Sequence, residues 1–405
     1  MPRLELRFVV LLALVAGLVP LGAQEKVIAL KGGQIHTISD GIIDNGVVLI
    51  RGGKILDVGR DLAVPAGATV VQAEGRIITP GLIDARTSFG VGQNDGWESA
   101  GPLMPQLRII ESFSLPPNHD WIREGVTAVY VSPGPENVIG GMGAVVKLAG
   151  RREEIVVSDA AGMSMSLGEV PKASFGQGAP RTRMGEIGLI REALVRAKEY
   201  RDAAGSSASS RTRALGLEAL GRVLRREVPA RIQANTPDDI TAAVRLGEEF
   251  NLRVVVDVGM GAYLVADRLA KAQVPVVVGP NMIGAGGGGR FEFSPQTEEN
   301  AARLHKAGVK LAICTDDSGG RSVVMEAAIA RAYGLPEADA LKAITLDAAE
   351  ILGVASRLGS LEKGKDADLV IWNRHPLSTW GRAEKVFIDG RLIFERQEQP
   401  RVPSY

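Results

Sequence analysis

The stretch PGLIDARTSFG, residues 80–90, places side chains at the spacing of a two-ligand metal clamp. Its apolar Leu-Ile pair is typical of a β-strand, and the strand runs into Asp84, Arg86 and Ser88. Side chains two residues apart on an extended segment point to the same side, so Arg86 and Ser88 are expected to project together. Two histidines at these positions would hold a metal. Arginine cannot, because its guanidinium stays protonated and has no free lone pair.

An acidic candidate lies in the run VKLAICTDD, residues 309–317, where Asp316 follows an apolar strand. The chain's single cysteine, Cys314, is in the same run. One cysteine cannot form an internal disulfide, and we expect it to be a small buried side chain on the strand. Asp316 is therefore the group in this segment that could take part in chemistry.

The segments that must position these residues alternate between strands and helices. Strand-like runs such as GVTAVYVS, ARIQAN and LRVVVDVG are separated by helical runs. The clearest helix is predicted for residues 236–251, where Thr236 is a good N-cap and Pro237 fits the first turn. Strands repeatedly followed by helices predict parallel β/α units. The length of this region favours an α/β fold with a (β/α)8 TIM-type barrel.

Both ends of the chain are rich in short β-type runs without a helical period. Residues 26–79 are typical of a meander of hairpins, and the C-terminal stretch contains a hairpin with Asp389-Gly390 at its turn. We expect the two ends to join into one β-sandwich that flanks the barrel. The predicted organisation is a signal peptide (1–23), a composite β-sandwich (24–79 plus 352–405) and a barrel (80–351).

The composition is that of a globular protein, with 45% hydrophobic and 23% charged residues among 405. Lys+Arg and Asp+Glu balance at 47 each, which gives no indication of nucleic acid or an anionic membrane as partner. A basic start, an apolar run and a small-residue exit at Ala23 are typical of a secretory signal. We expect an exported protein, periplasmic or secreted, with no membrane span after signal removal. A retained N-terminal anchor is the alternative.

Several motifs, in register along the chain, resemble the amidohydrolase superfamily and specifically its imidazolonepropionase-like branch. They are ITPGLIDA, GVTAVYVSPGPENVIGGMGAVVKLAG, GMSMSLGEVPK, TPDDITAAVRLGEEFNLRVVV, VKLAICTDDSGG and GSLEKGKDADLVIW. The resemblance implies a barrel with a flanking β-sandwich built from both chain ends. It also implies hydrolysis of C–N bonds, in non-peptide or dipeptide amides, by a metal-bound hydroxide at the barrel mouth. Relatives use one or two divalent metals such as zinc for this purpose.

At the positions that hold the metal in this family, the chain carries other residues. Arg86 and Ser88 stand at the His-x-His after the first strand, and Gln233 stands at the fifth-strand histidine. The region around Val258 lacks the sixth-strand histidine, whereas Asp316 matches the eighth-strand acid. Hydrolytic zinc sites use roughly three protein ligands, mostly imidazole or carboxylate. We therefore expect no metal cofactor.

Three further matched positions are expected to line the pocket at the mouth. Glu169, in LGEVPK, matches an acid that could be a ligand in relatives. Lys147, in AVVKLAG, is compared with the carbamylated lysine of some members, with an ordinary strand lysine as the alternative. Asn235 follows Gln233 by two residues. The glycine-rich run 284–290 is expected to be a mouth loop, with a phosphate cradle as the alternative.

The four histidines do not restore a metal site. None is predicted at the C-terminal end of a barrel strand, and structural or surface roles are expected for His36, His119, His305 and His375.

Three functions from different classes remain open. The protein is a pseudoenzyme that binds a small polar ligand, a non-catalytic subunit that pairs with an intact amidohydrolase or with itself, or an active hydrolase of C–N bonds with an atypical site centred on Asp316. Metal content and a hydrolysis screen discriminate between them.

A specific hypothesis explains Arg86. The first and eighth strands of a closed barrel are neighbours, so Arg86 and Asp316 should converge. Loss of the metal would leave a buried carboxylate unpaired, which is costly. We predict that the Arg86 guanidinium replaces the metal's charge and bonds Asp316, or failing that Glu169, with Ser88 and Gln233 as neutral hydrogen-bonding filler. The alternative is that Arg86 turns to solvent or to Asp84.

Overall fold

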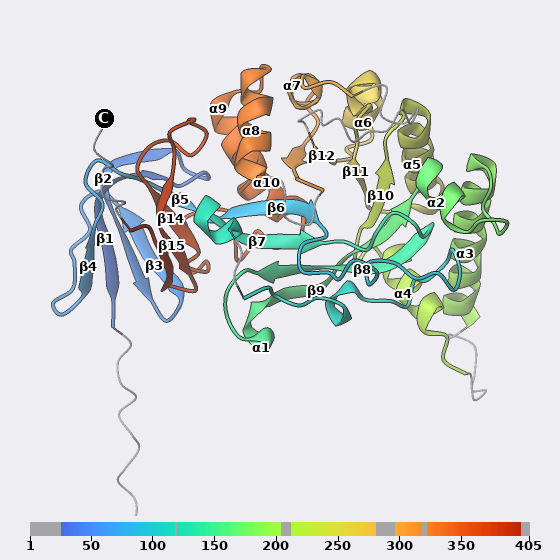
Figure 1. Cartoon of the computed structure of the whole chain (residues 1–405), viewed down its shortest axis with the longest axis horizontal. Coiled ribbons are helices and arrows are strands. Elements are labelled where there is room, and N and C mark those ends of the chain that lie inside the picture. Colours follow the sequence, from blue (N-terminus) through green and yellow to red (C-terminus); the bar gives the residue numbers. More distant parts are fainter. Residues whose placement is uncertain (1–25, 118–119, 204–211, 281–295, 317–321, 398–405) are drawn as a thin grey trace, which may run out of the picture.

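The computed structural model describes residues 26–117, 120–203, 212–280, 296–316 and 322–397. The strands of these segments form two eight-stranded sheets, one at the left of Figure 1 and one at its centre. The predicted signal peptide, the glycine-rich run 284–290 and His119 lie outside the described residues. No helix of the described segments is long and apolar enough to cross a membrane.

The first sheet combines strands from both ends of the chain (Figure 1). Its order is β16-β15-β14-β5-β1-β2-β3, with β4 paired to β1, and β14 and β5 join the two ends by antiparallel pairing. The turn between β15 and β16 has positive φ at Asp389 and Gly390, as the sequence predicts. The strands are β1 (Ile28–His36), β2 (Ile42–Arg51), β3 (Lys54–Gly59), β4 (Thr69–Gln72), β5 (Ile77–Pro80), β14 (Leu369–Trp372), β15 (Ala383–Ile388) and β16 (Arg391–Glu395).

The second sheet is a nearly closed, barrel-like ring. Its strands follow one another in chain order, and the backbone N–H of Asp316 donates to Arg86 O at 3.1 Å across the seam between the last strand and the first. The strands are β6 (Leu82–Thr87), β7 (Val126–Val131), β8 (Ile139–Lys147), β9 (Val156–Ser166), β10 (Ala230–Ala234), β11 (Val254–Val258), β12 (Val276–Val278) and β13 (Leu311–Ile313).

The expectation of uniform parallel β/α units is wrong for one part of this ring. Strand β8 runs antiparallel to both β7 and β9. A parallel crossover needs a dozen or more residues, and only residues 132–138 separate β7 from β8, so the chain turns back directly. Gly143 permits close packing there, because a Cβ on it would lie 2.1 Å from the Tyr130 hydroxyl.

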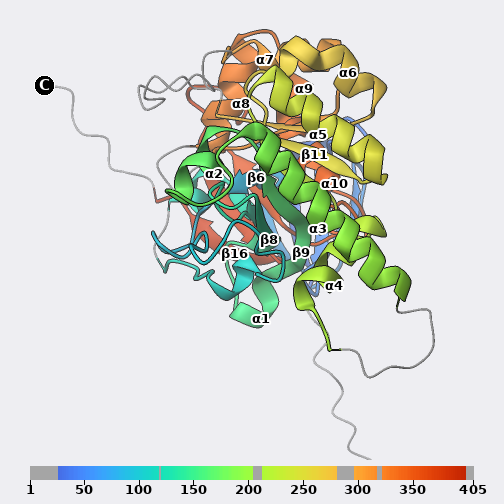
Figure 2. The same ribbon diagram turned by 90° about the vertical axis from the view of Figure 1, so that its right-hand side faces the viewer.

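Helices cover the ring on its outer side. Figure 1 shows α5 to α9 above the strands, and Figure 2 shows the long α3 in front, between α5 and α4. Thr236 caps α5 as predicted, accepting a hydrogen bond from the Asp239 backbone N–H. The helices are α1 (Arg152–Ile155), α2 (Glu169–Ser174), α3 (Arg183–Ala203), α4 (Leu215–Leu224), α5 (Pro237–Phe250), α6 (Ala266–Lys271), α7 (Asn300–Lys306), α8 (Val323–Ala332), α9 (Glu337–Ala343) and α10 (Leu346–Ile351). Short 3₁₀ helices are η1 (Ile109–Glu111), η2 (Trp121–Glu124) and η3 (Ala262–Val265).

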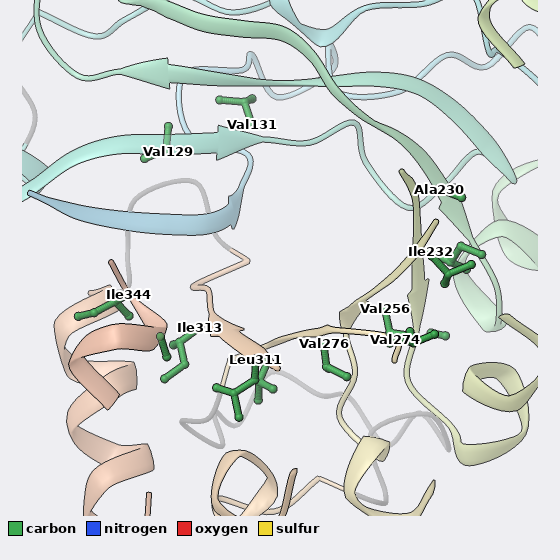
Figure 3. Packing of buried hydrophobic residues seen from close by; sticks show 14 of the residues in the cluster. Val129, Val131, Ala230, Ile232, Val256, Val274, Val276, Leu311, Ile313 and Ile344 are labelled. Atoms are coloured by element: carbon green, nitrogen blue, oxygen red, sulfur yellow. The ribbon is translucent and has the colours of Figure 1, made fainter. Parts of the chain in front are cut away.

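The two faces of the ring carry different cores. Alternate residues such as Ile232, Val256 and Ile313 belong to the large cluster shared with the helices (Figure 3). Their neighbours in the sequence, among them Val255 and Cys314, belong to a smaller interior cluster. The alternation follows from the two-residue period of a strand. Cys314 is fully buried, as expected.

A buried lysine ties the base of the ring to the first sheet. Lys147 lies opposite Ala128, near the start of β7, and its Nζ contacts carboxylates of Asp366 at 2.8 Å, Asp368 at 3.0 Å and Asp389 at 2.6 Å. Burial alone would lower its pKa, but the three aspartates together raise it. The expectation that Lys147 lines the mouth pocket is wrong, because the antiparallel course of β8 carries this residue to the opposite end of the ring.

Candidate active site

Arg86 points into the ring because β6 is irregular. Asp84 pairs with Val129 and Thr87 with Val131, so β6 uses one residue more than β7 over this interval. An extra residue of this kind re-aims the side chains beside it. Ala85 belongs to the interior cluster, and the Arg86 side chain, 4% exposed, bonds partners inside the ring.

The Arg86 guanidinium joins three parts of the ring. Its Nη1 donates to Oδ1 of Asp316, just beyond β13, and its Nη2 donates to Oε1 of Gln233 on β10 at 2.7 Å. Its Nε lies 3.7 Å from Oδ2 of Asp257 on β11. The predicted contact between Arg86 and Asp316 is confirmed. The hydrogen bond to Asp316 is not bidentate, because the two terminal nitrogens bind different residues.

A second arginine completes the network. Arg231 on β10 donates to both oxygens of Asp257, at 2.9 and 2.6 Å, and to Ala85 O at 3.0 Å. Its guanidinium carbon lies 3.7 Å from the ring centroid of Tyr130. Burial raises the pKa of Tyr130 to about 12, so this phenol stays neutral at physiological pH. Inside the ring, the positive charges of Arg86 and Arg231 are therefore balanced by the negative charges of Asp316 and Asp257.

Asp84 belongs to a different environment. Its carboxylate accepts from Thr315 Oγ1 at 2.6 Å, Thr315 N at 3.2 Å and Arg86 N at 3.1 Å, in the seam between β6 and β13. Burial raises the pKa of Asp84 to about 7. The Arg86 side chain does not turn to it, so the alternative expectation for Arg86 is wrong.

The other expected pocket residues are dispersed. Ser88 lies beyond the end of β6 and is exposed, so it is not filler around the ion pair. Glu169 bonds Lys172 at 2.7 and 2.8 Å and Arg183 at 2.8 Å on α2 and α3, and no described contact joins it to Arg86. Asn235 and Val258 are buried directly after β10 and at the end of β11. Val258 has φ 69°, and Asn235 Oδ1 has no described hydrogen-bond partner.

Sequence reasoning missed Arg231, Asp257 and Tyr130. A signal was present in the strands themselves: ARIQA places Arg231 two residues before Gln233, and VVVDV places one acid in a run of valines. Because parallel strands in register direct paired residues to the same side, Gln233 and Asp257, which pair, both face inward. A charged residue in such a strand needs a buried partner of opposite charge.

The histidines lie elsewhere. His36 is the last residue of β1 in the first sheet, its ring 5.6 Å from that of His375, and His305 lies in α7. Among the described residues, no three histidine, cysteine or acidic side chains are grouped closely enough to hold a metal.

The donor set around Asp316 does not fit a divalent metal. The nearest neighbour of Asp316 is the cationic Arg86 guanidinium, which would repel the ion. The other groups at this guanidinium are the neutral amide of Gln233 and the Asp257 carboxylate, whose two oxygens already accept hydrogen bonds from Arg231. Amide oxygen and a single carboxylate are weak ligands for zinc compared with imidazole and thiolate. No catalytic step through a metal is therefore derived for these residues.

Comparison with known proteins agrees with this architecture. The sequence profile of the amidohydrolase family matches residues 218–393. The crystal structure of an amidohydrolase from Thermotoga maritima MSB8 is 34% identical, with a TM-score of 0.85, and the match covers 91% of this chain and 100% of that one. The chain belongs to the amidohydrolase family.

Two further relatives place it within the family. Amidohydrolase tasK from Hapsidospora irregularis is 30% identical over 396 residues, which cover 86% of this chain but only 40% of that protein. An imidazolonepropionase from Mesorhizobium japonicum is 24% identical, with 85% of this chain and 91% of that protein covered. The resemblance to the imidazolonepropionase-like branch of the amidohydrolases is confirmed.

Replacement of Arg86 should destabilise this amidohydrolase fold. In Arg86→Ala, Asp316 and Gln233 lose their partner, but the Asp316 side chain is 27% exposed and water compensates in part. We expect a loss of about 1–3 kcal/mol in the free energy of unfolding, measured by urea denaturation. Adding Asp316→Asn should recover part of that loss, whereas Ser88→Ala should change stability by less than about 0.5 kcal/mol. If the losses caused by Arg86→Ala and Asp316→Asn simply add in the double variant, the two residues are not coupled.

Asp84 should make stability depend on pH. Its folded pKa of about 7 lies above its ordinary value of 3.8, so the folded state holds a proton that the unfolded state has lost. The stability from this group is fully present below about pH 4 and is lost as the pH rises through 7. Asp84→Asn should remove this contribution. Between pH 5 and pH 8 the free energy of unfolding should therefore fall further in the wild type than in the variant. An unchanged difference would contradict the shift.

Proposed function

We propose that this chain is a metal-free member of the amidohydrolase family that binds a small polar ligand at the barrel mouth and does not hydrolyse it. Arg86 supplies the positive charge that a divalent metal supplies in relatives. The observation that carries the proposal is the pair of hydrogen bonds by which the Arg86 guanidinium bridges Asp316 and Gln233.

Polar groups for a ligand remain around this bridge. The Asp316 side chain is 27% exposed, which leaves part of its carboxylate open to solvent. Asn235 lies directly after β10 and is buried, and its Oδ1 has no described partner. Hydrogen-bond donors on a ligand, such as amide or amine N–H groups, would satisfy both acceptors.

A second candidate function is hydrolysis of C–N bonds without a metal. It is favoured by the same exposed carboxylate, because Asp316 could take a proton from a water as a general base. A third role, as a partner-supporting subunit of an intact amidohydrolase or of a homo-oligomer, is consistent with loss of catalysis.

We infer that residues 1–23 direct export to the periplasm or beyond, and that the sheet built from both chain ends is a flanking β-sandwich. The organisation into residues 24–79 plus 352–405 and residues 80–351 is supported by the pairing of β5 with β14.

The functional proposal predicts a specific pattern in two screens. The wild type should show no turnover above background with dipeptides, lactams and cyclic ureas. A thermal-shift screen of the same compounds should yield ligands that raise the melting temperature, since a ligand of the folded state stabilises it. The shift should be lost in Asp316→Asn and kept in Ser88→Ala. Turnover that disappears in Asp316→Asn would replace the proposal with the hydrolase alternative.

A further inference from the structure

A separate cleft of about 680 Å³ lies between the barrel and the C-terminal strands. It is lined by η2, α8, the end of β14 and the following loop through residue 383, and no residue of the Arg86 network lines it. Its volume is in the range of small-molecule sites, which is roughly 300–1,000 Å³.

A fixed tryptophan, Trp372, closes the floor of the cleft and is itself only 2% exposed. Trp372 Nε1 donates to Thr79 Oγ1 at 2.9 Å, which holds the polar edge of the indole inside the protein. The ring packs over Gly125, where an added Cβ would lie 2.6 Å from Cη2 and Cζ2 of Trp372. The indole therefore cannot move toward η2 to fill the cleft.

One wall is a loop ordered by its own hydrogen bonds. Asn373 and Arg382 exchange them: Arg382 N donates to Asn373 Oδ1 at 2.7 Å, and Asn373 N donates to Arg382 O at 3.1 Å. Gly381 is packed so tightly that an added Cβ would lie 2.4 Å from His375 O. The wall is thus formed before any ligand arrives, which reduces the entropy lost on binding.

Apolar side chains are exposed at the opening. Met325 on α8 is 54% exposed, and Trp380, between two lining residues of the loop, is 71% exposed. Val324, Ala328 and Leu377 add apolar lining. This part of the cleft is suited to a hydrocarbon chain.

The rim carries two arginines that form no ion pair among the described residues. Arg382 donates to Thr379 O and Gly381 O, and Arg396 donates to Ala383 O and Arg123 O. Carbonyls satisfy hydrogen bonds but do not neutralise a unit charge, and neither arginine pairs with an acid among the described residues. The third rim arginine, Arg123, does have a partner, Asp120, at 3.1 Å.

We propose that this cleft binds an amphipathic carboxylate, with its hydrocarbon chain against Val324, Met325 and Ala328 and its carboxylate between Arg382 and Arg396. A guanidinium matches a carboxylate in geometry as well as charge, and apolar burial adds the remaining affinity. Glu124 also lines the cleft and disfavours a dianion, which makes a monocarboxylate the better match.

Calorimetric titration of the full chain with sodium octanoate tests the proposal, with 1-octanol and octylamine as matched probes. Octanoate should bind one per chain and more tightly than either probe.

In the double variant Arg382→Gln with Arg396→Gln, octanoate binding should weaken by roughly tenfold while that of 1-octanol stays within about twofold. Arg374→Gln, an exposed arginine of the same loop outside the cleft, should bind like the wild type. Ala328→Phe, which fills the cleft, should abolish binding of both.

Melting curves establish that each variant is folded, and the titration at raised salt gives a test that needs no variant. Octanoate affinity should fall with salt and 1-octanol affinity should not. The proposal is overturned if octanoate shows no saturable binding, if octylamine binds as tightly, or if the double variant matches the wild type. Substitution of Arg86 should leave octanoate binding unchanged, so failure of the barrel-mouth proposal is distinguishable from failure of this one.

Discussion

The arrangement of polar side chains inside the ring depends on the hydrogen bonds of one guanidinium, that of Arg86. Arg86 is almost completely buried, and a buried cation is stable only where anions and acceptors surround it. Asp316, Gln233 and Asp257 come from three different places in the ring and meet at this group. The pairing of β6 with β7 is irregular between Asp84 and Thr87, and this irregularity turns the Arg86 side chain inward. A guanidinium is suited to the position because its planar donors reach several acceptors at once, which a lysine could not do.

The ring contains a second buried ionic cluster at its other end. Lys147 is surrounded by Asp366, Asp368 and Asp389, two of which lie at the ends of strands β14 and β15. The two clusters have different consequences. Lys147 joins elements distant in sequence, so its cluster holds the sheets together. The Arg86 network lies among the C-terminal strand ends, where the catalytic groups of barrel enzymes are found.

The sequence allowed some features to be predicted because they depend on local chemistry or on pairwise geometry. Thr236 as a cap and Asp389-Gly390 as a turn follow from backbone requirements. The contact of Arg86 with Asp316 follows from the closure of the ring and the cost of a buried carboxylate. The antiparallel course of β8 was not predicted, since strand direction depends on connection length rather than on residue pattern, and this error misplaced Lys147. Ser88 was misplaced because the two-residue period ends with the strand. The pairing of Arg231 with Asp257 required knowledge of strand register.

The central claim is that a guanidinium takes the place of a metal. Elemental analysis of the purified protein, after dialysis against a mild chelator, tests it most directly. We expect zinc, manganese and iron well below one per chain in the wild type. Uptake should increase in the variant with Arg86→His and Gln233→His, which places two imidazoles beside Asp316. Stoichiometric metal retained by the wild type would show that Arg86 does not replace the metal.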